Sequence, residues 1–172
     1  RRKCFEEING FNTDYWGGED TKLCYDLTQK LKKKMAYDPK VLVWHHRRKT
    51  ARDHIKQVSM WAIYRGYFSR KFPETSLRLV YFVPPLFLLG VIFGGIASYF
   101  NDFLKMGYFS VISLYLLYCT YTAAKTKSIK FFFPVLFLLV ATHLAYGLGM
   151  IRGILMKKSL DRTFHPLEKV DI

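Results

Sequence analysis

Three long, uncharged apolar runs limit what this chain can fold into more than any other feature of its sequence. They cover residues 79–100, 106–124 and 131–151 and are 22, 19 and 21 residues long. Each length is close to the roughly 20 residues that a helix needs to cross the core of a bilayer. Helices in the core of a soluble protein seldom follow one another at this length with connectors this short. The sequence therefore predicts an all-α transmembrane region of about three helices within residues 76–156.

Charged residues are concentrated before the first apolar run. Residues 1–78 hold 18 of the 27 Lys and Arg residues and 9 of the 13 Asp and Glu residues. The net charge of +14 alone would suit nucleic-acid binding. The basic residues lie next to apolar runs, however, where anionic lipid headgroups are the expected partner. We therefore expect membrane lipids, and not nucleic acid, to contact this part of the chain.

The basic residues also predict an orientation in the membrane. Residues 47–71 hold eight of them and the loop 125–130 holds three, whereas residues 101–105 hold one Lys and one Asp. By the positive-inside rule, residues 1–78 and the loop 125–130 face the cytoplasm. We expect an integral protein of the plasma membrane in this orientation.

Basic residues after the third run conflict with a third crossing. Three crossings would place the tail, residues 157–172, outside the cell, yet Arg152, Lys157 and Lys158 favour the cytoplasm. Either the tail is exported, because C-terminal charges are weak determinants of topology, or one apolar segment turns back without crossing. The sequence leaves both possibilities open.

The third run also holds three glycines and a histidine. Gly147, Gly149 and Gly153 make this segment the easiest to bend or to pack tightly against a neighbour. His143 is an ionisable residue within an apolar run, which by default marks a functional site. It is equally able to hydrogen-bond a neighbouring helix, and we favour this structural role.

A basic, aromatic segment, residues 51–75, precedes the first apolar run. Ile55, Val58 and Trp61 recur near helical spacing among basic residues, and Pro73 ends the pattern. Such an amphipathic helix is typical of a headgroup surface. The alternative is a helix that packs on the preceding domain with a solvated basic face, and both descriptions can hold at once.

The sequence YWGGED raises the question of an acidic functional group. Apolar residues at i, i+4 and i+8 predict a helix over about 21–33, with Asp20 as its N-cap and Glu19 beside it. In the structural interpretation, Gly17 and Gly18 turn the chain and the acids only cap the helix. In the functional interpretation, a carboxylate fixed at a helix start is a candidate general base.

The sequence YDPKVLVWHH predicts a turn followed by a strand. Val41 and Val43 alternate with other residues after the turn at Asp38, and the strand would end at His45 and His46. Adjacent residues on a strand point to opposite faces, so only one histidine can face a given site. Neither has a metal-ligand partner at a recognised spacing, and an exposed strand end is the structural alternative.

Taken together, FEEINGFNTDYWGGEDTKLCYDL, MAYDPKVLVWHHRR and IKQVSMWAIYRGYF resemble the C-terminal half of the catalytic domain of family-2 glycosyltransferases. THLAYGLGMIRGIL is similar to the last membrane segment of membrane-anchored members. The resemblance implies an α/β partial GT-A domain, the distal half, over residues 1–50. An interfacial amphipathic helix (51–75), the all-α transmembrane region (76–156) and a tail (157–172) would follow.

The resemblance also implies an activity. A sugar would pass, with inversion, from a nucleotide-linked donor to a hydroxyl of a glycan or lipid-linked acceptor. Asp20 would take the proton of that hydroxyl, with Glu19 beside it. Five further residues would lie on the acceptor side: Trp16, Gly17, Gly18, Gln57 and Arg65.

The resemblance also implies a divalent metal, Mg or Mn. His46, or alternatively His45, would lie near this metal and near the donor diphosphate. The main metal ligands and the nucleotide-binding strands of the family precede the acid pair, so we expect this chain to be the distal part of a longer protein and inactive alone. Lys22 stands where an acid is common and is expected on a solvated helix face.

The competing hypothesis is a small non-enzymatic membrane protein whose basic segment binds lipid or a partner.

Overall fold

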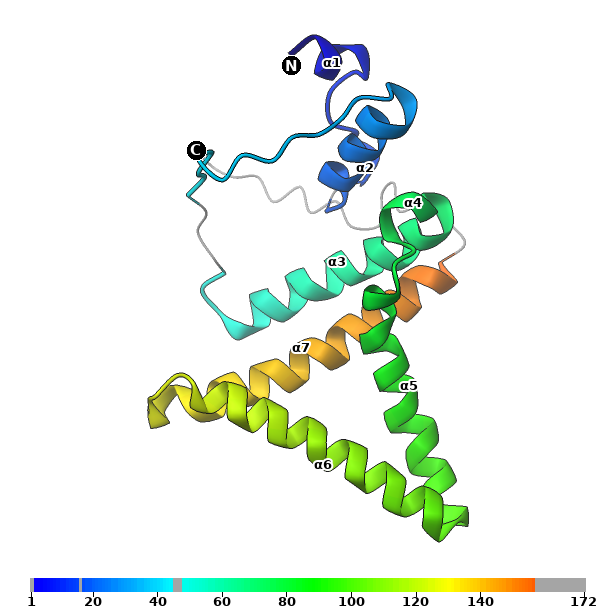
Figure 1. Cartoon of the computed structure of the whole chain (residues 1–172), viewed down its shortest axis with the longest axis vertical. Coiled ribbons are helices and arrows are strands. Elements are labelled where there is room, and N and C mark those ends of the chain that lie inside the picture. The colour runs from blue at the N-terminus through cyan, green and yellow to red at the C-terminus, as the bar shows by residue number, and fades with distance from the viewer. Residues whose placement is uncertain (1, 16, 45–47, 157–172) are drawn as a thin grey trace.

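The computed structural model describes residues 2–15, 17–44 and 48–156, which are predominantly helical (Figure 1). The N-terminal part consists of short elements: α1 (Arg2–Glu7), η1 (Thr13–Tyr15), α2 (Glu19–Tyr25) and η2 (Asp26–Lys30). The later elements are α3 (Ala51–Lys71), α4 (Pro73–Ser76), α5 (Leu79–Phe100), α6 (Asp102–Ala124) and α7 (Ile129–Leu155).

The predicted α/β half domain, the distal half of a GT-A fold, is wrong: the described residues contain no strand or sheet. The turn at Asp38 is present, and the Asp38 carbonyl accepts a hydrogen bond from the Val41 N–H at 3.2 Å. Residues 41–44 have no regular structure, and their side chains are 74% to 95% exposed. A strand needs a neighbouring strand to satisfy its backbone groups. None of the described segments is a strand that could pair with residues 41–44, so alternating valines alone did not produce one.

Helix α2 begins at Glu19, two residues before the predicted start, and its N-cap is Gly18 instead of Asp20. The Glu19 carboxylate turns back and accepts the N–H of Gly17, which stabilises this earlier entry into the helix. The helix continues through the π-helical turn η2, which ends at Lys30.

Lys22 lies on the inner face of α2, so the prediction of a solvated position is wrong. It is 6% exposed, and its ammonium pairs with the carboxylate of Asp26, which is 7% exposed. The ammonium also lies 5.3 Å from the centroid of the Phe72 ring. A buried cation is tolerated here because a carboxylate and an aromatic face replace its water shell.

An aromatic cluster on the second half of α3 holds the N-terminal part of the chain. The ring centroids of Tyr15 and Phe68 are 5.5 Å apart in an edge-to-face arrangement, which is a favoured geometry for aromatic pairs. The buried members of the cluster are Tyr15, Ile63, Tyr64, Tyr67 and Phe68. Tyr15, and with it the turn before α2, is therefore fixed against α3.

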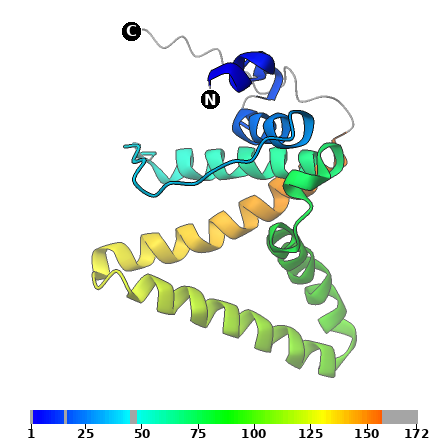
Figure 2. The ribbon, with the colours of Figure 1, turned by 45° about the horizontal axis from the view of Figure 1, so that its top comes forward.

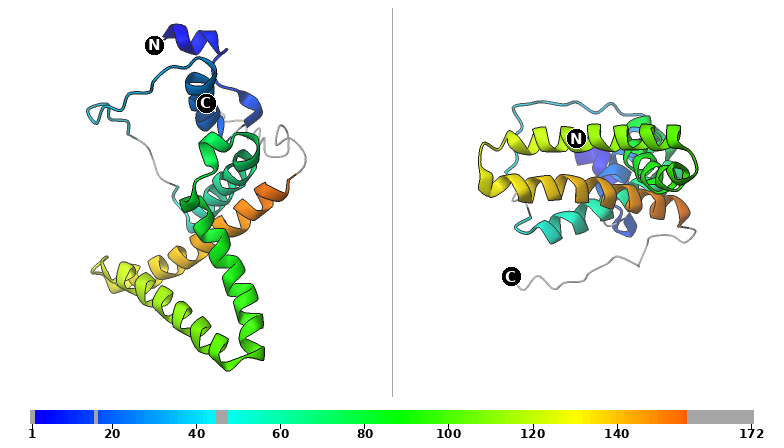
Figure 3. Two further views of the ribbon diagram at one scale, coloured as in Figure 1. Left: turned by 45° about the vertical axis from the view of Figure 1, so that its right-hand side comes forward. Right: turned by 90° about the horizontal axis from the view of Figure 1, so that it is seen from below.

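The helices α5, α6 and α7 are each long and apolar enough to cross a membrane, as predicted. Helices α5 and α6 join at Asn101, whereas α7 runs along α3 (Figures 1 and 2). Seen from below, α5 points toward the viewer while α3 and α7 lie lengthwise (Figure 3). Helix α5 contacts α7 near its own start, where a Cβ at Gly147 would lie 2.7 Å from the Pro84 carbonyl oxygen.

Candidate functional site

A cavity of about 180 Å³ lies where the start of α2 meets α3 and α7. We call it the acid-motif pocket. Its lining comes from three stretches that are far apart in the sequence: Gly17, Gly18, Asp20, Thr21, Trp61, Tyr64, Arg65, Phe68 and Tyr146. Four of the residues predicted from the sequence thus lie together: Gly17, Gly18, Asp20 and Arg65.

The two glycines bring the acid motif into contact with α3. Gly17 has a φ of +99°, which side chains rarely adopt, and a Cβ there would lie 3.0 Å from the Tyr64 ring. A Cβ at Gly18 would lie 2.9 Å from the Phe68 ring. The backbone therefore rests on the aromatic side chains of α3, and any larger residue would lift Asp20 away from the pocket.

The two acids have different surroundings. Glu19 is half-buried, and its carboxylate accepts the Gly17 N–H, so it stabilises the turn. Asp20 is exposed and lines the pocket. Its Oδ1 accepts the N–H of Thr21 at 2.6 Å and the Thr21 hydroxyl at 3.3 Å. Of the two, Asp20 is the carboxylate available to a molecule in the pocket.

Arg65 supplies a cation to the same pocket. Its guanidinium donates to the Ser76 hydroxyl at 3.2 Å and to the Thr75 carbonyl at 3.4 Å. The guanidinium carbon lies 4.4 Å from the centroid of the Tyr81 ring. Among the described residues no carboxylate forms an ion pair with it. A half-buried guanidinium held by neutral groups can still attract an anion.

Tyr146 of α7 is a pocket residue that the sequence reasoning missed. Tyr146 lies in an apolar run whose residues we expected to face lipid, so the sequence analysis did not single it out. One signal was present: Tyr146 follows the polar His143 by three residues, which places both on one helix face. His143 itself lies 2.9 Å, through Nδ1, from the Tyr115 hydroxyl of α6, which is the structural role that we favoured.

Other predicted residues lie elsewhere or outside the described residues. Gln57 lines a second cavity of about 760 Å³ at the start of α3, together with basic residues such as Arg48 and Lys49. Trp61 lines both cavities and separates them. The predicted Trp16, His45 and His46 fall outside the described residues.

The residues that the structure describes do not form a metal site. Within the described residues there is no group of three or more His, Cys, Asp or Glu side chains that could hold a metal ion. The Mg or Mn predicted from the resemblance therefore has no ligand set in this part of the chain. No step of the reaction proposed below depends on such an ion.

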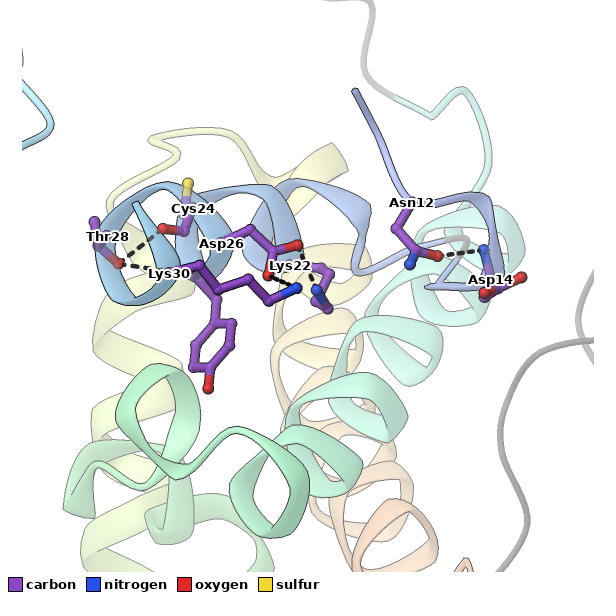
Figure 4. A network of polar contacts seen from close by, with 8 residues as sticks. Asn12, Asp14, Lys22, Cys24, Asp26, Thr28 and Lys30 are labelled. Atoms are coloured by element: carbon purple, nitrogen blue, oxygen red, sulfur yellow. Dashed lines mark hydrogen bonds and ion pairs between the residues drawn. The ribbon is translucent and has the colours of Figure 1, made fainter. Parts of the chain in front are cut away.

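An ionic network along α2 and η2 joins Lys22, Asp26 and Lys30 (Figure 4). Lys22 contacts one oxygen of Asp26, and Lys30 Nζ lies 2.8 Å from the other. Burial alone would raise the pKa of Asp26, but hydrogen bonds from Lys22 and Lys30 outweigh burial and lower it below its usual value. At neutral pH the network is therefore charged and holds the helix that carries Asp20.

Comparisons with protein-family models, curated proteins and solved structures found no match. The candidate site thus rests on its own geometry. A carboxylate, a guanidinium and a phenol hydroxyl from three distant stretches line one small cavity beside helices long enough to span a membrane.

Proposed function

We propose that this chain is the acceptor-side, membrane-bound part of a glycosyltransferase. It transfers a sugar, with inversion, from a nucleotide-linked donor to a hydroxyl of a glycan or lipid-linked acceptor. One observation carries the proposal: Gly17, Gly18 and Arg65, which the resemblance assigns to the acceptor side, share one pocket with Asp20, the proposed base. Its position beside the apolar helices suits an acceptor presented at the membrane surface.

In this reaction Asp20 is the general base. Its carboxylate takes the proton of the acceptor hydroxyl while the hydroxyl oxygen attacks the anomeric carbon of the donor sugar. The bond between that carbon and the nucleotide diphosphate breaks, and the diphosphate leaves with the bonding electrons. Thr21 orients the carboxylate through its N–H and hydroxyl.

Arg65 and Tyr146 complete the acceptor side. The Arg65 guanidinium is held by Ser76, Thr75 and the Tyr81 ring, so it presents a fixed positive charge opposite Asp20. An anionic or hydroxyl-rich acceptor head can bind between Asp20 and the Arg65 guanidinium, which also contacts the Tyr146 hydroxyl. The described residues contain no nucleotide-binding sheet, so the proposal concerns the acceptor side, and its test requires the full-length natural protein.

Asp20→Asn tests the proposed base. In membranes containing the full-length protein, sugar transfer from a panel of radiolabelled nucleotide sugars should fall by about 10²- to 10⁴-fold, since the amide cannot take the proton. Asp14→Asn is the matched control, because Asp14 is also exposed and lies outside the pocket. Circular dichroism should show unchanged helix content in both variants. Near-normal transfer by Asp20→Asn would falsify the assignment of the base.

A second candidate function is a non-enzymatic membrane protein whose basic segment binds anionic lipid. The larger cavity favours it, because Arg48, Lys49 and His54 line that cavity together with Leu138 of α7. This function predicts no sugar transfer from any donor. It also predicts that replacing Arg48 and Lys49 by Gln weakens retention of phosphatidylserine during purification.

A further inference from the structure

Helices α3 and α7 run side by side in the same direction. His54 Nε2 near the start of α3 lies 3.4 Å from the Thr142 hydroxyl, and Arg70 near its end donates to the Met156 carbonyl just after α7. The contact therefore extends over some 15 residues of each helix, which is about 22 Å. Figures 1 and 2 show the two helices following one another along this length.

The backbones of the two helices are in direct contact. A Cβ at Gly66 would lie 2.2 Å from the Met150 carbonyl oxygen, and one at Gly153 would lie 2.0 Å from that of Ile63. A Cβ at Gly149 would lie 2.8 Å from the Ser59 carbonyl oxygen. No side chain, lipid or water fits between backbones at this separation. The second half of α7 must therefore share the membrane depth of α3.

Helix α3 does not itself cross the bilayer core. It is not among the three helices apolar enough to span a membrane. It holds six charged residues along 21 positions, a number that hydrocarbon does not tolerate. They are Arg52, Asp53, Lys56, Arg65, Arg70 and Lys71. A helix of this kind lies at the headgroup level.

The end of α7 and the start of α5 lie at the same side of the membrane. Arg65 joins α3 to Ser76, immediately before α5, and Gly147 of α7 touches the Pro84 backbone near the start of α5. Three crossings would separate these two ends by the full bilayer thickness. An even number of crossings is required to bring them together.

We infer that α7 does not cross the membrane: it lies in one leaflet beside α3, and only α5 and α6 cross. The charges agree, since Lys125, Lys127 and Lys130 at one end of α7 and Arg152 at the other then lie on one side. The tail thereby returns to the side of the acid-motif pocket, and exposed side chains such as Phe133, Phe137 and Leu148 bind acyl chains of that leaflet. This topology holds whether or not the chain is a transferase.

Cysteine labelling in intact cells tests the topology. In full-length protein lacking Cys4, Cys24 and Cys119, single cysteines are introduced as Asn101→Cys, Ser128→Cys or Ser159→Cys. A membrane-impermeant maleimide should label only Asn101→Cys before permeabilisation and the other two only afterwards. The reverse pattern, with Asn101→Cys alone protected, would support the same topology in an inverted orientation.

Labelling of Ser159→Cys from the side of Asn101→Cys would overturn the inference, because α7 would then end across the membrane. Labelling of Ser128→Cys from that side would also overturn it, because α7 and not α6 would cross. If a cysteine variant fails to insert, a second measurement uses the chain with its natural cysteines. In this measurement a reporter protein is fused after Ile172. The same reporters inserted after Ser128 should give the same result as at Ile172, with a cytoplasm-dependent fluorescent protein active and an alkaline phosphatase, active only outside, inactive at both positions. Opposite results at the two positions exclude the topology.

Discussion

The contact between α3 and α7 differs sharply from the contact between α5 and α6, although both pairs of helices contain glycines. Between α3 and α7, a Cβ on Gly66 or Gly153 would meet a backbone oxygen at 2.2 or 2.0 Å. Between α5 and α6, a Cβ on Gly90 or Gly107 would find no atom within 4 Å. A cavity of about 460 Å³ opens there instead, and its lining is apolar.

The difference shows that glycine has two roles in this membrane region. Along α3 and α7 it permits backbone contact, so that dispersion forces between protein atoms fix the helices. Along α5 and α6 the contact runs through aromatic side chains: the Tyr108 hydroxyl donates to the Val91 carbonyl at 3.3 Å, and the ring centroids of Phe87 and Tyr115 lie 4.4 Å apart. The first pair should therefore tolerate substitution poorly and the second pair well.

Leucine substitutions give the largest expected contrast. Gly153→Leu would place four carbon atoms where the Ile63 backbone lies, and we expect it to cost more than about 3 kcal/mol and to separate α7 from α3. The matched variant Gly90→Leu adds the same side chain to open apolar space and should be neutral or slightly stabilising. Thermal unfolding in detergent measures both. Equal midpoints for the two variants would show that the contrast is wrong.

Removing one member of the buried ion pair should have the next largest effect. Lys22→Met leaves the Asp26 carboxylate buried without its closest cation, which we expect to cost about 3 kcal/mol. The double variant Lys22→Met with Asp26→Leu should recover most of the loss, since no charge remains buried. Arg2→Met, which breaks an exposed pair with Glu6, is the control and should not shift the unfolding midpoint measurably. A loss in the double variant as large as in Lys22→Met would contradict this account.

The smallest expected effect is a pH dependence that separates the two regions. Because the folded-state pKa of Asp26 lies below its usual value, the folded chain favours the charged carboxylate. The resulting stability is present above the ordinary Asp pKa of about 4 and is lost as pH falls through the lower folded value. The unfolding midpoint of the natural chain should therefore drop between about pH 5 and pH 3 by more than that of Asp26→Asn.

Hydrogen exchange locates this pH effect. Protection of the amides in α2 should decrease on acidification, whereas the amides of α5 and α6 should not respond, because the ion pair between Asp102 and Lys105 is exposed. An equal response in both regions would show that Asp26 is not the group responsible.

The apolar helices were the most predictable part of the fold. The first run, 79–100, coincides with α5, because no capping side chain extends the helix beyond the run. Helix α6 begins at Asp102, four residues before the predicted run, since the Asn101 side chain caps it by accepting the Leu104 N–H at 3.1 Å. Hydropathy identifies the apolar segment, whereas capping side chains determine the residues at which the helix begins and ends.

The N-terminal part was less predictable. The helix after GGED was expected, but Asp20 is not its cap, because Glu19 turned back to Gly17. Lys22 was expected in solvent, because a sequence shows charge and not the partner that compensates it. The strand around Val41 did not form, since strands depend on a neighbour that no local pattern guarantees. Among the site residues, Asp20 and Arg65 were foreseen together, whereas Tyr146 was not.

The sequence by itself determined that three segments are long and apolar enough to cross a membrane, that a basic aromatic helix precedes them, and that an acid motif follows two glycines. These properties are local: they depend on the length, polarity and spacing of neighbouring residues. Only the tertiary structure decided that α7 lies on α3, that Lys22 is buried, and that Asp20, Arg65 and Tyr146 line one pocket. Such pairings depend on which surfaces fit, and glycine permits close contact without specifying the partner.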